Sequence, residues 1–211
     1  MCIRDREGAA PWAFLGVYFD PYPGADIPTR AMTMQEMRER AGPQARRAMN
    51  HHFVRLDAAY IENEADPDVP GLYRYWSRLL GKPAVIYARA DRIDPSELIG
   101  LQGAYVVYLA QELISPDDRK VNFVIGHNDG FRLYVNGELA IEADETLWWT
   151  PYNSVCVAEL RKGRNRLVLK LRKSGERLDF TLGIRAWEPD KHHNRLDWCT
   201  DLAYGNPLAW T

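Results

Sequence analysis

The stretch that most constrains the fold is residues 120–170, in which short strand-like segments alternate with turns. In residues 121–125 the odd-numbered side chains are apolar, as expected when successive side chains face opposite sides of a sheet. The turns are His127–Gly130 and Asn136–Gly137, which contain residue pairs that tolerate positive φ. Short strands separated by turns every ~8–12 residues predict an antiparallel sandwich or barrel.

Similar segments extend this pattern along most of the chain. We expect strands at residues 12–19, 84–90, 104–114, 120–126, 131–135, 138–143, 155–160, 165–172 and 179–185. Seven Trp and eleven Tyr provide bulky side chains to fill the space between two sheets. The predicted fold class is therefore mainly β, a jelly-roll β-sandwich of about nine to ten antiparallel strands.

A helical insertion interrupts the strands near the N-terminus, at about residues 27–60. Thr33–Glu36 fits a capping box, and the sequence predicts helices at 34–41 and 43–58 on either side of Gly42. Residues 73–80 are expected to form a turn of helix or an extended edge, and residues 91–98 a loop.

The predicted organisation is a leader at 1–10, one sandwich domain at 11–188, and a C-terminal tail at 189–211. The tail is expected to pack on the sandwich, with Trp198 as an anchor, or to lead to a further domain. Residues 1–6 resemble a translated sequencing adapter of the kind found in metagenomic assemblies. We therefore expect the native chain to start at or after Glu7 and to be longer upstream, which leaves the compartment open.

Composition argues against several classes of function. The net charge is −2 and no Lys/Arg block stands out, so nothing predicts binding to nucleic-acid phosphates. No apolar run approaches the ~18 residues of a membrane span. Cys2, Cys156 and Cys199 are interpreted as free thiols, with a disulfide between Cys156 and Cys199 as the alternative.

Two regions carry potential metal ligands. Residues 62–71 carry four carboxylates, but their spacing matches no complete calcium loop, so a solvated loop is the favoured interpretation. The tail combines potential ligands in a spacing that fits no zinc pattern: His192, His193, Asp197, Cys199 and Asp201. We predict no cofactor; a structural calcium ion is supported by no clear motif.

Several motifs together resemble a known family. They are Trp12–Gly16, Ser115–Asp118, Asn128–Gly130, Tyr134–Gly137, Lys162–Asn165 and Leu169–Lys170. The pattern resembles the galactose-binding-domain-like jelly rolls, including the non-catalytic modules attached to many glycoside hydrolases, over about residues 11–188. The resemblance implies a binding module whose ligand meets loops at one end, or a shallow face, of the sandwich. The helical insertion and the absence of a clear calcium loop depart from the common pattern of that family.

Aromatic residues provide the best candidates for ligand binding. Sugars stack their apolar faces on aromatic rings, and residues 147–153 contain Trp148, Trp149 and Tyr152. Adjacent residues in an extended segment point to opposite sides, so at most one of the two tryptophans is expected in the core. The alternative is that both rings fill the end of the sandwich.

Polar and aromatic residues elsewhere give further candidates. His127, Asn128 and Asp129 are expected at a turn, where they would contact a ligand near such a ring or simply form the turn. Trp76, with Tyr73, is an alternative ring platform.

The sequence contains no nucleophile elbow, zinc-binding helix motif or phosphate loop, so we predict no catalytic residues. The alternative of an enzyme acting alone would need an acid pair or a His-acid pair that converges in a pocket, and the two acids of a glycosidase can be distant in the sequence. The predicted function is a non-catalytic module for a carbohydrate or glycoconjugate, from a larger protein truncated upstream. The alternative is a structural or interaction domain that packs on a missing catalytic domain of the same parent chain.

Overall fold

The computed structural model describes residues 10–19, 54–88, 92–99, 104–174, 177–187 and 198–209. Its elements are β1 (Pro11–Tyr18), α3 (Val69–Leu80), β2 (Val85–Tyr87), α4 (Ser96–Ile99), β3 (Tyr105–Ser115), β4 (Arg119–His127), β5 (Phe131–Val135), β6 (Glu138–Ala143), β7 (Ser154–Leu160), β8 (Gly163–Lys173), β9 (Phe180–Ala186), β10 (Ala203–Tyr204) and a 3-10 turn, η2 (Pro207–Ala209).

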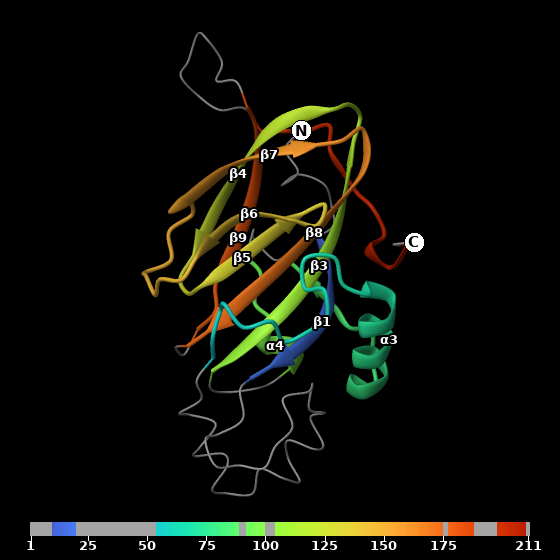
Figure 1. The fold of residues 1–211 in the computed structure, drawn as a ribbon, viewed down its shortest axis with the longest axis vertical. Coiled ribbons are helices and arrows are strands. Elements are labelled where there is room, and N and C mark those ends of the chain that lie inside the picture. Colours follow the sequence, from blue (N-terminus) through green and yellow to red (C-terminus); the bar gives the residue numbers. More distant parts are fainter. Residues whose placement is uncertain are drawn as a thin grey trace, which may run out of the picture.

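The strands form two antiparallel sheets, which confirms the predicted β-sandwich (Figure 1). The large sheet has the order β2-β1-β3-β8-β5-β6, with β10 pairing β3 beyond the end of β1. The small sheet has the order β7-β4-β9. Each expected strand is present, with ends shifted by one or two residues, except that β2 is much shorter than expected.

The large sheet is buried on both faces. Between the sheets, β3 contributes Val107 and Leu109 to the main core. On the opposite face, Val106 and Tyr108 join a second core with α3 and the segment 54–65. Figure 1 shows α3 alongside β1, away from β4 and β7. The near-continuous apolar sequence of β3 follows from this double burial.

The two predicted turns differ in their geometry. Asn136 and Gly137 have φ of 51° and 84°, so they form the expected tight hairpin between β5 and β6. Residues 128–130 have no positive φ, and they connect β4 of the small sheet to β5 of the large sheet. The motif Asn128–Gly130 predicts a hairpin like that at Asn136–Gly137, and this prediction is wrong because these residues cross between the sheets.

The helices also differ from expectation. Val69–Leu80 is helical, with the Asp68 carboxylate accepting a bond from the Gly71 N–H and Gly81 ending the helix at φ 65°. Residues 54–58 contain no helix, so the predicted helix 43–58 is wrong at its C-terminal end, while the predicted helix 34–41 lies outside the described residues. None of the helices in the described part of the chain has the length and apolar composition needed to cross a bilayer.

Candidate functional site

The chain passes from β6 of the large sheet to β7 of the small sheet through residues 144–153, the bridge segment. Trp148 in this segment is 95% exposed, and Tyr152 is 50% exposed. Trp149 is half-buried, with its indole nitrogen out of contact with water. The two tryptophans are therefore unequal, as the extended-segment argument predicts, and Trp148 does not fill the end of the sandwich.

The first end of the bridge segment is fixed by the connection between β4 and β5. The Thr146 hydroxyl donates to Asp129 Oδ1 over 3.3 Å, and the Leu147 N–H donates to the Asn128 carbonyl over 2.8 Å. The Asn128 side chain is also occupied, because its Oδ1 accepts from the Asp179 N–H at 2.8 Å. These bonds fix the chain immediately before Trp148.

The second end is fixed by His127. The Asn153 side chain accepts from the His127 N–H over 3.0 Å and donates to its carbonyl over 2.7 Å. The imidazole lies between the Ser154 hydroxyl, 2.9 Å from Nε2, and the Asp129 carbonyl, 3.0 Å from Nδ1. Burial lowers the pKa of His127, so this ring is neutral at neutral pH and serves as a hydrogen-bonded spacer.

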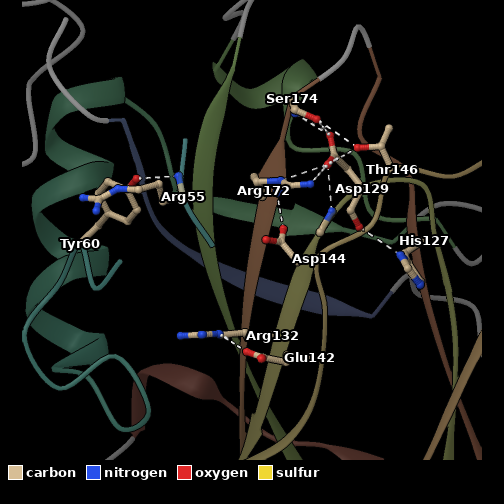
Figure 2. A network of polar contacts seen from close by, with 11 residues as sticks. Arg55, Tyr60, His127, Asp129, Arg132, Glu142, Asp144, Thr146, Arg172 and Ser174 are labelled. Atoms are coloured by element: carbon tan, nitrogen blue, oxygen red, sulfur yellow. Dashed lines mark hydrogen bonds and ion pairs between the residues drawn. The ribbon is translucent and has the colours of Figure 1, made fainter. Parts of the chain in front are cut away.

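Asp129 holds together three parts of the chain, as Figure 2 shows. Its Oδ1 accepts from the Gly130 N–H at 2.9 Å and from Arg172 Nη2 at 3.0 Å, while its Oδ2 accepts from the Ser174 N–H and hydroxyl. Arg172 also pairs with Asp144 at the start of the bridge segment. A Cβ at Gly130 would lie 2.8 Å from the Asp144 carboxylate and 3.2 Å from the Arg172 guanidinium, so these two side chains pack closely over the glycine.

The bridge segment then runs across the outer face of the small sheet, where two glycines make room. A Cβ at Gly126 of β4 would lie 2.4 Å from the Thr150 carbonyl oxygen. A Cβ at Gly183 of β9 would lie 2.4 Å from the Trp198 ring. The backbone of Thr150 therefore occupies the space of a side chain at Gly126, and the Trp198 ring occupies the space of a side chain at Gly183.

Two arginines stack on the aromatic residues of this face. The Arg92 guanidinium lies 4.1 Å from the centroid of the Trp149 ring. The Arg185 guanidinium lies 5.1 Å from the Tyr152 ring and 4.3 Å from the Trp198 ring. The outer face of the small sheet thus carries aromatic rings interleaved with cations.

The structure places the other predicted ligand residues differently. Trp76 is fully buried against Gly16, so the expectation that it offers a ring platform is wrong. Tyr73 is partly buried against both cores. His127, Asn128 and Asp129 lie directly below the bridge segment, but their polar groups are used in bonds that hold it in place. Their observed role is to support the aromatic residues.

A second polar cluster lies on the far face of the large sheet and was not expected. Lys170 has no exposed surface, and its Nζ donates to Glu64 Oε2 at 2.8 Å and to the Ala58 carbonyl at 2.6 Å. The hydroxyls of Tyr108 and Tyr134 donate to the same carboxylate. The acidic loop is therefore not fully solvated, because Glu64 turns inward and fastens it to the sheet.

The charges of this cluster balance one another. Burial alone would raise the pKa of Glu64, but the bonds from Lys170 and the two tyrosines outweigh it, and the pKa is lowered. Burial lowers the pKa of Lys170, and Glu64 opposes that shift. Arg132 adds a second cation, 3.3 Å from Glu64, and also bonds Glu142 (Figure 2).

The described residues contain no group of three or more His, Cys, Asp or Glu arranged to hold a metal ion. Cys156 and Cys199 are free thiols, and burial raises the pKa of Cys156 to about 11. Asp201 of the tail pairs with Arg119 at 2.7 Å. The remaining tail candidates, His192, His193 and Asp197, lie outside the described residues, as does Cys2.

A scan against protein-family models and a search of curated proteins find no match. Several solved structures overlap with part of the chain. A PA14 domain of the MpAFP antifreeze protein shares 13% identity and a TM-score of 0.37, over 51% of this chain and 56% of that one. A beta-glucosidase from Kluyveromyces marxianus in complex with glucose shares 14% identity and a TM-score of 0.40, over 54% and 15%. A PA14 sugar-binding domain from an RTX adhesin shares 13% identity and a TM-score of 0.39, over 55% and 77%.

These neighbours do not point specifically to the galactose-binding-domain-like group that the sequence resembles. The chain spans about half of the first of these structures and a small part of the second. With every TM-score below 0.5, the function has to follow from the side chains of this protein.

Sequence reasoning missed Arg92 and Arg185. Residues 181, 183 and 185 share the outer face of β9 because strand side chains alternate, and the sequence at these positions is Thr, Gly and Arg. A glycine beside an arginine on an exposed strand face was the available indication that something else packs there.

Proposed function

We propose that this domain is a non-catalytic β-sandwich module that binds a carbohydrate through the aromatic residues of the bridge segment. The observation that carries the proposal is the exposure of Trp148, whose ring is 95% accessible although both ends of its segment are fixed by hydrogen bonds. An exposed indole contributes little to the core and offers a large flat surface for the apolar face of a sugar.

The way in which the bridge segment is held also supports binding. Ordering a loop on association costs free energy, and a segment that is already fixed avoids that cost. The bonds from Asp129 and His127 fix this segment on either side of Trp148 and Tyr152. The two exposed rings are thus presented by a preorganised support, as expected for a module that recognises sugars by stacking.

The environments of Glu64 and Asp129 favour a structural role over a catalytic one. A general acid for glycoside hydrolysis needs a raised pKa, whereas the pKa of Glu64 is lowered. Asp129 uses both carboxylate oxygens to hold Arg172 and Ser174. These acids therefore stabilise the structure, and we propose no catalytic role for them.

The test is binding to an array of oligosaccharides, followed by titration calorimetry on the best binder. Trp148→Ala and Tyr152→Ala should each weaken binding by at least about two- to tenfold, since the stacking alone is worth about 0.5–1.5 kcal/mol beyond the buried area of the ring. Tyr87→Ala is the matched control, because Tyr87 is 58% exposed on β2 of the other sheet. All three variants should melt close to the wild-type temperature.

Two outcomes would reject the proposal. The first is a wild-type protein that binds no oligosaccharide on a broad array, which would favour an interaction domain that packs against another domain. The second is binding that Trp148→Ala and Tyr152→Ala leave unchanged. An upstream domain in the parent protein stays a prediction, and the full-length gene would test it.

A further inference from the structure

Arg185 differs from the other arginines around the sandwich. Its Nε is buried and has no hydrogen-bond partner in the described part of the chain, although Tyr152 and Trp198 lie against its guanidinium. Several other arginines face carboxylates, such as Arg172 with Asp129 at 3.0 Å. Arg185 as a whole is partly exposed, and no carboxylate of the described residues forms an ion pair with it, so its guanidinium is suited to an anion from outside the protein.

The surroundings of Arg185 fit this interpretation. Across the small sheet its register partner is Asn122, which is paired in turn with Val157, 44% exposed on β7. Val155, the next outward residue on β7, is 53% exposed. The acid on this strand face, Glu159, pairs with Lys120 of β4 and not with Arg185. The cation thus lies beside apolar surface and aromatic rings.

A second polar atom on the same face also lacks a partner. The Thr181 hydroxyl is buried without a hydrogen bond and lies four residues before Arg185 on the outward side of β9. A Cβ at Gly126 would lie 2.5 Å from this hydroxyl, so the space between Thr181 and β4 is narrow. The same Cβ would lie 2.4 Å from the Thr150 carbonyl oxygen, and four strand residues span ~13 Å, so Thr181 is covered by the bridge segment and only Arg185 is a candidate contact for a ligand.

We infer that the ligand of this face is an acidic sugar, whose carboxylate or sulfate group binds Arg185 while its apolar ring face lies on Tyr152. This inference rests on the proposed carbohydrate-binding function and specifies its ligand class. A guanidinium is a planar fork that binds a carboxylate or sulfate through two parallel hydrogen bonds. Stacking against Tyr152 and Trp198 restricts the plane of the fork.

The experiment uses matched probes in which only the charge changes. Glucan, galactan and mannan oligosaccharides are each tested beside their C6-oxidised uronates and their 6-sulfates. The acidic members should bind at least about tenfold more tightly than the neutral ones, since hydrogen bonds to charged groups are worth about 1.5–3 kcal/mol. The difference should shrink between about 0.1 M and about 1 M salt, where the Debye length falls from ~10 Å to ~3 Å.

Variants of Arg185 test whether this residue causes the preference for acidic over neutral probes. Arg185→Gln should remove at least about nine-tenths of the preference for acidic probes while binding of the neutral probes stays. Arg185→Lys should recover only part of it, because an ammonium lacks the planar fork. The matched control is Arg74→Gln, which removes the same charge from the exposed surface of α3. Melting curves of each variant confirm that the sandwich is folded.

The outcomes separate the two proposals. Tighter binding of the uronates identifies a carboxylate ligand, and tighter binding of the sulfates identifies a sulfated one. Equal or preferred binding of neutral probes overturns the acidic-sugar inference and leaves the carbohydrate-binding proposal intact. A preference for acidic probes that Arg185→Gln leaves unchanged overturns the assignment to Arg185. Absence of binding to every probe overturns both proposals.

Discussion

Replacing Lys170 with methionine tests whether the buried ion pair holds the segment 54–68 on the large sheet. Methionine keeps the length and apolar stem of lysine but removes the charge and its three donors. In the native structure Nζ bonds both Glu64 and the Ala58 carbonyl, and the lysine has no exposed surface. The variant therefore leaves a buried carboxylate without its lysine partner and a carbonyl without a donor.

The expected loss is about 3 kcal/mol in the free energy of unfolding. Breaking a buried ion pair by removing one partner costs about 3–5 kcal/mol. We expect the lower end because Tyr134 and Arg132 still contact Glu64, at 2.6 Å and 3.3 Å. For a chain of about 200 residues each kcal/mol shifts the melting temperature by about 2–4 °C, so the shift should be about 6–12 °C.

The assay is thermal and urea unfolding followed by circular dichroism. Lys120→Met is the matched control: Lys120 also lies on a strand and pairs with a glutamate, at 3.4 Å, but that pair is largely exposed. Such surface pairs contribute about 0–1 kcal/mol. A Lys170→Met loss no larger than that of Lys120→Met would refute the reasoning. Adding Glu64→Gln to Lys170→Met should recover part of the loss, because the double variant buries no unpaired charge.

Three further results are expected. The folded pKa of Glu64 is lowered, so its contribution to stability is present above its unfolded pKa of about 4.3 and is lost as pH falls through the folded pKa. Urea titrations at several pH values should therefore show that the free energy of unfolding falls less at acid pH in Glu64→Gln than in the wild type. Asp129→Asn should destabilise the protein by about 3 kcal/mol, since Arg172 loses a buried carboxylate, and amide hydrogen exchange in the bridge segment should accelerate; unchanged exchange would contradict its anchoring role. Gly183→Ala should cost about 1–3 kcal/mol and change the near-UV circular dichroism spectrum, because its Cβ would displace the Trp198 ring; an unaltered spectrum would contradict that contact.

Local sequence rules predicted the strands because the residue pattern of each strand, and the turn residues at its ends, lie within the strand itself or next to it. Asn136 and Gly137 adopt the positive φ that their residue types favour, and Asn165 bonds the Arg161 N–H and carbonyl as expected for a turn before a strand. Antiparallel strands joined by such turns leave few arrangements other than a sandwich. The fold class could therefore be predicted from the sequence.

The second core was not predictable by the same reasoning. Strand β3 is apolar on both faces over its first six residues, YVVYLA, which shows that both faces are covered but does not identify the covering segment. The cover consists of α3 and the segment 54–65, which includes part of the acidic loop, and the charge of that loop favoured a solvated interpretation. Glu64 is buried only because Lys170, more than 100 positions later, lies opposite it. Pairing between residues so distant in sequence cannot be inferred from local composition.

At residues 127–129, residue type alone does not separate contact with a ligand from structural support. His127, Asn128 and Asp129 were candidates for ligand contact because turn residues with free polar groups often bind ligands. In the structure these residues connect the sheets, so their polar groups meet both ends of the bridge segment and are satisfied there. Turn chemistry and support of the aromatic residues require the same residue types. The chain passes from one sheet to the other between β4 and β5, and this is why these residues support the bridge segment and do not form a free turn. Which sheet each strand joins depends on strand pairing, so residues 127–130 alone do not predict it.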